Sequence, residues 1–256
     1  GIQLAMGRGG ERAAVLMPRR DGQLPIARIP GRAVLDGIQV LRAATYSFEN
    51  MALDAVASEV LGKGKLIGEE DDDKVAEIVR LFDEDKPALA AYNLEDTRLV
   101  TEIFAALDLM SFAVQRQRMT GLPIDRAGGS VAAFDHLYLP RLHRAGYVAA
   151  EPGRIVERGT APGGYGLSSP PGLYRDVLLL DFKTLSPSII VSFRIDPLGL
   201  AVAHQEDAPI DGFDGARFSR EHHILPQLIS DLWADRDRAK ARGDQAMSRA
   251  IKILMN

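Results

Sequence analysis

The sequence predicts an α+β protein with more than one domain, and three patterns lead to this expectation. Short apolar runs typical of β-strands occupy residues 12–36. Apolar residues then recur at helical spacing over much of residues 50–147. A segment rich in glycine and proline, 151–173, comes next, and a new apolar run begins behind it. We expect this segment to connect two separately folded parts.

The first expected elements are strands. The runs "RAAVLMP" and "LPIARIPG" flank "RRDG", in which Asp21-Gly22 is a good signal for a hairpin turn. A third run of the same kind, "RAVLD" at 32–36, follows them. We therefore expect a β-hairpin and a third strand in this part of the chain.

Helices are expected next. One begins after Asn50 and stops at Gly62, and another starts from the acidic run "GEEDDD" at 68–73. Acidic side chains complement the positive end of the helix dipole, so we interpret this run as a solvated helix start rather than a metal site. The longest helical pattern begins after Pro87. A further helix is expected over 127–147.

Proline and glycine indicate where helices should break or turn in the rest of the chain. Pro140 should break or kink the helix over 127–147, because proline lacks the N–H that a helix interior uses. An irregular stretch, roughly 196–219, leads to a final helical hairpin with Gly243 near its turn. The pattern ends at "IKILMN" without a cap or stop signal, which predicts that the chain is a piece of a longer protein.

The stretch "DVLLLDFKTLSPSII" predicts a strand, a tight loop and a helix. Val177 to Leu180 form a short apolar run that indicates a buried strand, and Asp181 lies where it leaves the core. Pro187 suits the first turn of a helix, where it has no N–H to lose. The backbone N–H groups of Lys183 to Ser186 would then suit a phosphate, and Asp181 a metal ion bound to it. An ordinary capped connection is the alternative.

Composition and charge exclude several classes of protein. The chain has 256 residues, 46% hydrophobic and 26% charged, which is typical of a globular protein. Its net charge of −4 gives no overall positive field, so any nucleic-acid surface must be local. Cysteine is absent, which excludes disulfides and thiolate metal sites and fits a reducing, cytoplasmic location. No apolar run approaches the roughly 20 residues of a membrane helix, and no secretion signal is evident.

Tyr92 and Asp96 form the first candidate site. They are four residues apart in "AYNLEDTRLV" and would share a helix face. The carboxylate could bind a divalent metal, and the phenol could hold an attacking water. A half-buried tyrosine beside an ordinary aspartate is the alternative, and spacing alone favours it.

The last helical hairpin forms the second candidate site. Arg236 and Lys240 are one turn apart, as are Lys252 and Asn256, and such cationic faces suit a triphosphate. A solvent face held by salt bridges is the alternative. The acids available for such bridges are Asp231, Asp235, Asp237 and Asp244.

In this order, these stretches resemble the family B DNA polymerases. "DFKTLSPSII" resembles the first polymerase motif, Asp-x-x-Ser-Leu-Tyr-Pro-Ser-Ile, and "KILMN" resembles the start of the second. "RDRAK" matches the fingers pattern Arg-x-x-x-Lys, and "YNLED" the third exonuclease motif, Tyr-x-x-x-Asp. "PGGY" resembles the Gly-Gly link between exonuclease and polymerase domains, although a plain loop is an alternative there. The resemblance covers nearly the whole chain.

The resemblance implies a domain plan. The end of a ribonuclease-H-like 3′-5′ exonuclease domain would occupy 1–110, and linking helices and a connector 111–172. Part of a palm sheet would occupy 173–222, and the first part of helical fingers 223–256.

The resemblance also implies a role for each matching residue. Asp181 and the Phe182 carbonyl would bind two Mg²⁺ ions that catalyse nucleotidyl transfer. Tyr92 and Asp96 would belong to the proofreading site, with Asp96 as a metal ligand. The residues that would bind the incoming nucleotide are Lys183, Thr184, Leu185, Ser186, Arg236, Lys240, Lys252 and Asn256. Those that would contact DNA are Gly163, Gly164 and Tyr165.

By this resemblance, the chain is expected to be part of a DNA-directed DNA polymerase that proofreads and acts in repair or translesion replication. Its partners would be primer–template DNA, dNTPs and a sliding clamp in the full-length protein, with no membrane. The alternatives are a non-catalytic nucleic-acid-binding or scaffold protein that keeps the polymerase fold, and a stand-alone nuclease. The nuclease hypothesis leaves the second half of the chain unexplained.

Two departures from the family pattern alter these expectations. No "DTD" occurs in the chain, and the first two exonuclease motifs are absent, so each active site lacks carboxylates that its metals need. We therefore expect the chain alone neither to extend nor to degrade DNA. Ser186 stands where the family has a tyrosine whose ring would collide with a ribonucleotide 2′-hydroxyl. A full-length protein with Ser186 should therefore discriminate poorly against ribonucleotides.

Overall fold

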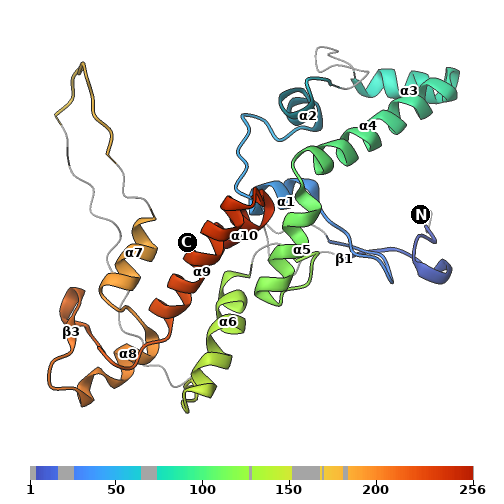
Figure 1. Ribbon diagram of the computed structural model, residues 1–256. Coiled ribbons are helices and arrows are strands. Elements are labelled where there is room, and N and C mark those ends of the chain that lie inside the picture. Colours follow the sequence, from blue (N-terminus) through green and yellow to red (C-terminus); the bar gives the residue numbers. More distant parts are fainter. Residues whose placement is uncertain are drawn as a thin grey trace. The chain divides into compact units, whose positions relative to one another are not determined.

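The computed structural model is mostly helical, and its strands form two short antiparallel pairs within the part of the chain that it describes (Figure 1). The described residues are 4–16, 26–64, 74–126, 129–151, 168, 170–180 and 184–255. The expectation of mixed α and β structure is confirmed, and the domain limits remain predictions. The chain divides into two compact units, Gly1–Phe134 with Trp233–Leu254, and Asp135–Leu232 with Met255–Asn256, and each is described by itself.

A small hairpin begins the first unit. After a short 3-10 helix, η1 (Arg8–Gly10), strands β1 (Ala14–Leu16) and β2 (Ile26–Arg28) pair antiparallel, with Val15 opposite Ala27. The expected strand pair is confirmed, while the turn signal Asp21-Gly22 lies outside the described residues.

The expected third strand at 32–36 is wrong. These residues form no strand. Asp36 instead begins helix α1 (Gly37–Ala43), because its side chain accepts a hydrogen bond from the Gln39 N–H at 2.8 Å. Because the Asp36 carboxylate caps the first turn of α1, this stretch leads into a helix and does not pair as a strand.

The helices of this unit follow the sequence signals closely. They include α2 (Leu53–Leu61), α3 (Lys74–Glu84), α4 (Lys86–Ala106), α5 (Leu109–Thr120) and α10 (Gln245–Met255). Gly62 ends α2 with a left-handed φ of 68°, which glycine adopts at little cost. Asp85 caps α4 by accepting from the Ala88 N–H, and Pro87 occupies the first turn of that helix.

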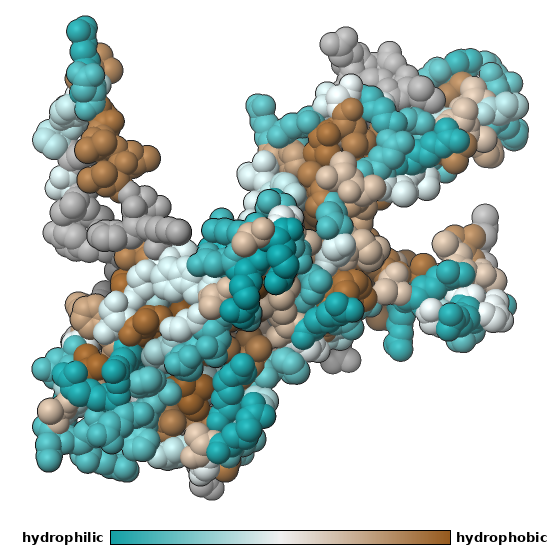
Figure 2. All heavy atoms as spheres, in the orientation of Figure 1, coloured by the Kyte–Doolittle hydropathy of each residue, from teal (hydrophilic) through white to brown (hydrophobic). Residues whose placement is uncertain are grey.

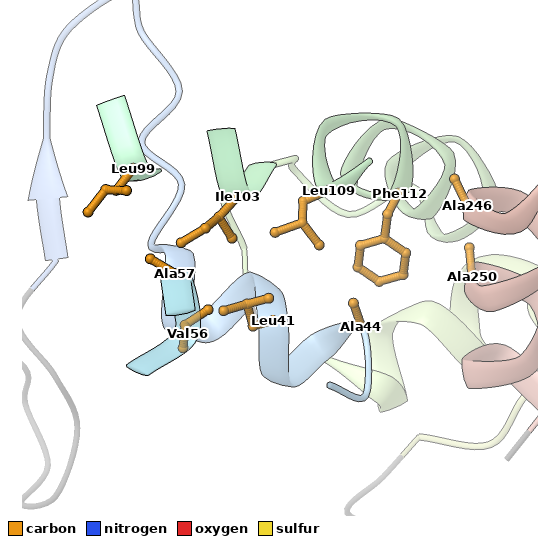
Figure 3. Packing of buried hydrophobic residues seen from close by; sticks show 10 residues of the cluster. All are labelled: Leu41, Ala44, Val56, Ala57, Leu99, Ile103, Leu109, Phe112, Ala246 and Ala250. Carbon is orange, nitrogen blue, oxygen red and sulfur yellow. The ribbon is translucent and has the colours of Figure 1, made fainter. Parts of the chain in front are cut away.

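The core of the first unit gathers residues from five helices (Figure 3). Leu99 of α4 and Leu109 of α5 are fully buried in this cluster. Ala246 and Ala250 bring α10 into the same cluster. These small residues allow α10 to approach its neighbours closely, so the core fixes the helix on which Lys252 lies.

Two long helices have residues in both units. They are α6 (Ser130–Arg144) and α9 (Leu225–Ala241). Of the expected break or kink at Pro140, the break is wrong, because α6 continues through the proline, while a kink there stays a prediction. Near the proline, the Arg141 guanidinium donates to the Leu137 carbonyl at 2.6 Å, so a side chain satisfies a helix acceptor at this point.

The second unit contains short elements. They are α7 (Leu185–Ser192), α8 (Pro197–Val202), two 3-10 helices, η3 (Ala203–Gln205) and η4 (Phe213–Gly215), and a pair of strands, β3 (Ile210–Asp211) and β4 (Arg217–Phe218). The expectation of an irregular stretch over 196–219 is therefore wrong. The dipeptide Asp196-Pro197 is a helix start, in which the aspartate caps and the proline takes the first helical position.

The expected buried strand at Val177 to Leu180 is also wrong. These residues form no strand, and their exposed fractions range from 75% to 90%. Figure 2 shows their apolar surface on the slender segment at the upper left. A strand needs hydrogen-bonding neighbours, and no strand in the described part of the chain pairs with this run.

One stretch, Leu185–Gln205, is long and apolar enough by composition to cross a membrane. It is not one continuous α-helix, because α7 ends at Ser192 and α8 begins at Pro197. Between them lies the Asp196 carboxylate, which binds other parts of the second unit. The stretch therefore does not indicate a membrane span.

Candidate functional site

The start of α7 provides the described part of the predicted phosphate loop. Thr184 adopts a left-handed conformation, with φ 56° and ψ 57°, and its carbonyl accepts from the Ser188 N–H at 3.0 Å. Pro187 is buried and anchors the first turn, while Leu185 and Ser186 are exposed. The first amides of a helix have no intrahelical acceptor and favour an anion. The expected helix start at this point is confirmed.

Arg236 and Lys240 lie one turn apart on α9 and are not held by the acids around them. Lys240 is exposed and Arg236 is partly buried. No salt bridge joins either of them to another residue that the structure describes. The buried Nε of Arg236 likewise has no hydrogen-bond partner among those residues. A buried donor without an acceptor calls for a partner that the described residues do not supply.

Three of the four neighbouring acids have other partners. Asp231 accepts from the Gln227 side chain at 2.8 Å, and Asp235 pairs with Arg238. Asp244 caps α10 by accepting from the Met247 N–H at 2.9 Å. The salt-bridged face offered as the alternative therefore involves Arg238 rather than Arg236 and Lys240.

Lys252 lies on an exposed position of α10, two residues beyond the buried Ala250. The same helix places the Arg249 guanidinium over the Tyr46 ring, 3.9 Å from its centroid. Lys252 therefore has a fixed helical support, and it forms no salt bridge with the described residues.

Tyr92 and Asp96 lie one turn apart on α4. Tyr92 is buried, with 9% of its surface exposed, and it lines a groove of about 680 Å³ between α3 and α4. Asp96 is partly buried and its Oδ1 atom is inaccessible to solvent. The structure therefore brings the phenol to an open groove, while the aspartate is not among the residues that line it.

The residues that the structure describes do not assemble a magnesium site. They contain no cluster of three or more histidine, aspartate or glutamate side chains that could hold a metal ion. Of the predicted ligands, only Asp96 is described, and a hard cation needs several oxygen donors. No catalytic step through the ion can be derived from this geometry.

Several predicted site residues lie outside the described part of the chain. They are Gly163, Gly164, Tyr165, Asp181, Phe182, Lys183 and Asn256. The described candidates fall in both compact units, with α7 in the second and the three cations in the first. Whether they face a common space therefore stays a prediction.

Sequence analysis missed one polar cluster in the second unit, centred on Asp196. This carboxylate is 1% exposed and accepts from the Tyr138 hydroxyl at 3.1 and 3.2 Å. The phenol of Tyr138 is protonated at neutral pH and donates, and burial raises its pKa well above the ordinary value, which keeps it protonated to still higher pH. The signal available in the sequence was Asp196-Pro197, a pair typical of a helix start.

Comparison with known proteins provides the remaining evidence. No protein-family model matches the chain. It is 49% identical to DNA polymerase II of Escherichia coli (strain K12) over 233 residues, which is 90% of this chain and 30% of that protein. It is 28% identical to a DNA polymerase of Thermococcus litoralis over 282 aligned positions, covering 100% of this chain and 16% of that protein. DNA polymerase 1 of Pyrococcus abyssi is 26% identical over 279 positions, covering 100% of this chain and 34% of that protein. The chain thus spans about a third or less of each of these relatives.

Proposed function

Because this chain belongs to the family B DNA polymerases, we propose that it forms part of an enzyme that adds deoxynucleotides to a primer 3′ end. The observation that supports this most strongly is the pair Arg236 and Lys240. They share a face of α9 and have no acid partner in the described residues, although acids surround them in the sequence. Two cations kept apart from nearby carboxylates suit the phosphates of an incoming nucleotide.

In the proposed nucleotide site, backbone N–H groups and two cationic side chains would bind the phosphate oxygens. The amides at Lys183 to Ser186 precede and begin α7 and would bind phosphate oxygens. Arg236 would form forked hydrogen bonds with the same group, and Lys240 would act as a point charge. The other proposed contacts come from α10 and the chain end, at Lys252 and Asn256.

The remaining roles complete the proposal. Magnesium is the proposed cofactor, with Asp181 and the Phe182 carbonyl as ligands, and it would stabilise charge during nucleotidyl transfer. Tyr92 and Asp96 would serve a 3′-5′ proofreading site, with Asp96 as a metal ligand there.

Gly163, Gly164 and Tyr165 would approach primer–template DNA. A cytoplasmic role in repair or translesion synthesis, with a sliding clamp as partner, is part of the same proposal.

Primer extension by the full-length protein tests the nucleotide site. Arg236→Ala and Lys240→Ala should each raise the KM for dNTP roughly 10- to 100-fold, because each removes a charge-assisted contact of about 1.5–3 kcal/mol. Arg238→Ala is the matched control, since Arg238 lies on the same helix but pairs with Asp235. Equal effects of all three substitutions would contradict the site, and a full-length protein that does not extend primers would contradict the function.

A second candidate function is a non-catalytic nucleic-acid-binding protein, which the exposed Ser186 in place of the family's tyrosine favours. The same assay separates the two candidates, because a binding protein would retain primer–template DNA without extending it. The 256-residue chain by itself is expected to be inactive, since it contains no "DTD". Extension or trimming by this chain above that of an Asp181→Ala, Asp96→Ala double variant would contradict this expectation.

A further inference from the structure

A single carboxylate connects three helices through residues that belong to the second unit. Asp196 lies just before α8 and accepts from the N–H of Gly199, at 2.9 Å, as the cap of that helix. It also accepts from the N–H groups of Ile224 and Leu225, at 3.1 and 2.6 Å, where α9 begins. Its third partner is Tyr138 of α6.

The two oxygens of the Asp196 carboxylate accept from the backbone N–H groups of different helix starts. Oδ1 receives the two amides at the start of α9, and Oδ2 receives the amide of Gly199. Tyr138 reaches both oxygens, and its own oxygen accepts from the Leu198 N–H at 3.0 Å. The cluster therefore satisfies N–H groups at two helix starts that would otherwise be buried without acceptors.

The packing around the cluster leaves little freedom for adjustment. A Cβ atom at Gly199 would lie 3.3 Å from the His222 carbonyl oxygen and 3.4 Å from the Ser219 nitrogen. The Ser219 N–H donates to the Gly199 carbonyl at 3.1 Å. Because α8 and the chain leading to α9 are in close contact here, the start of α9 is fixed with respect to α8.

We propose that Asp196 is a positioning residue for nucleotide binding, because it fixes the start of the helix that presents Arg236 and Lys240. This inference rests on the proposed function and names a residue that acts on the same site through α9. Asp196 itself would touch neither nucleotide nor DNA. Asp196 would act by fixing the direction of the α9 axis.

The length of α9 makes that direction important. Lys240 lies 15 residues beyond Leu225, or about 22 Å along the axis at roughly 1.5 Å per residue. A tilt of about 5° at the start of the helix would displace Lys240 by on the order of 2 Å. Hydrogen bonds tolerate only about half an ångström of variation, so a displacement of that size would break a phosphate contact.

Asp196→Asn tests the proposal in the full-length protein. The amide has one acceptor oxygen, so in either orientation its NH₂ group must face a backbone N–H, from Gly199 or from Ile224 and Leu225. We expect the KM for dNTP to rise about tenfold while the affinity for primer–template DNA stays unchanged. Tyr138→Phe removes one of the donors and should raise KM in the same direction, by about threefold.

Two further variants distinguish positioning from general loss of stability. Glu206→Gln is the matched control, because Glu206 accepts from the Ser219 hydroxyl and the Arg220 N–H of the same unit but forms no hydrogen bond with the described residues of α9. It should leave KM for dNTP unchanged even where it lowers the melting temperature. Combined with an Arg236→Ala, Lys240→Ala double variant, Asp196→Asn should raise KM less than twofold further, because its effect acts through those two contacts.

The outcomes separate this inference from the function on which it rests. If the wild-type protein does not extend primers, both the proposed function and this inference fail. If it does, and Asp196→Asn and Tyr138→Phe both leave KM unchanged, this inference alone is overturned. Full additivity with the Arg236→Ala, Lys240→Ala double variant would overturn it as well. Should Asp196→Asn fail to fold, as judged by circular dichroism, Tyr138→Phe decides the question.

Discussion

The guanidinium of Arg249 lies over the ring of Tyr46, 3.9 Å from its centroid, and joins α10 to the chain that follows α1. Phe48 stacks near the same tyrosine, with ring centroids 6.2 Å apart. Because Ala246 and Ala250 of α10 contribute little apolar area to the core, the stacked arginine adds a specific contact on this helix. It thereby supports the helix that presents Lys252.

Replacing either member of this pair should lower the free energy of unfolding by about 1 kcal/mol. Arg249→Gln and Tyr46→Leu each remove the cation–π contact but leave a side chain that still fills part of the original volume. Chemical denaturation of the 256-residue chain measures the change. Arg118→Gln on the exposed face of α5 is the control and should change stability by less than about 0.5 kcal/mol. A double variant as unstable as the sum of the two single variants would show that the residues do not interact.

The centre of the first unit should depend strongly on Leu99. This side chain is fully buried, and Leu99→Ala would leave a cavity among its neighbours, so we expect a loss of about 2–5 kcal/mol. Val100→Ala on the adjacent position of α4 is the control, because Val100 is 43% exposed and should lose less than about 1 kcal/mol. Similar losses for both variants in urea denaturation would contradict the packing in Figure 3.

Glu206 should contribute a pH dependence to the second unit. Its pKa lies below the ordinary value of 4.5, first because it accepts a hydrogen bond from the Ser219 hydroxyl and then because it accepts from the Arg220 N–H. A depressed folded-state pKa means that its stabilising effect is fully present above about pH 4.5 and is lost as the pH falls through the folded value. Stability should therefore fall on acidification below about pH 4.5.

Two variants test this pH dependence. Ser219→Ala should raise the pKa of Glu206 toward its ordinary value, which carbon NMR of the side-chain carboxyl group measures directly. Glu206→Gln should remove this part of the acid dependence from the unfolding free energy. An unchanged pKa in Ser219→Ala would show that the hydroxyl is not the main cause.

The sequence predicted most helices because their signals are local. Asp85 and Pro87 start α4, Gly62 ends α2, and Gly243 lies in the turn before α10 with φ 72°. Each signal acts within a few residues of its own position, so spacing and residue type are sufficient to identify it. The β1–β2 pair was recognised for the same reason.

Features that depend on distant residues were missed or predicted wrongly. The apolar run Val177 to Leu180 has the composition of a strand, but strand formation depends on a pairing neighbour elsewhere in the chain. The role of Asp196 depends on Tyr138, 58 residues earlier, and on Ile224, 28 residues later. Sequence spacing contains no information on such contacts. For the candidate site, the local helix positions of Arg236 and Lys240 were predictable, but the partners that occupy the nearby acids were not.

Ser186 offers the last prediction. It is the second residue of α7, exposed beside the buried Pro187, and it stands where the family resemblance has a tyrosine. A hydroxymethyl group cannot occupy the volume of a phenol ring, so a nucleotide bound there would meet no obstacle to its 2′-hydroxyl. The wild-type full-length protein should therefore incorporate ribonucleotides readily.

Restoring the ring should restore the discrimination. We expect Ser186→Tyr to increase the ratio of dNTP to rNTP incorporation at least about tenfold, measured as the two values of kcat/KM on the same primer–template. Ser186→Ala is the matched control, because it removes the hydroxyl without filling the space, and its ratio should equal that of wild type. Leu185, which is 46% exposed on the same turn, is the neighbouring side chain that we test as the alternative occupant of this space. If Ser186→Tyr leaves the ratio unchanged while Leu185→Ala lowers it, then Leu185 rather than residue 186 excludes the ribose hydroxyl. If neither substitution changes the ratio, sugar selection is not exerted at the start of α7.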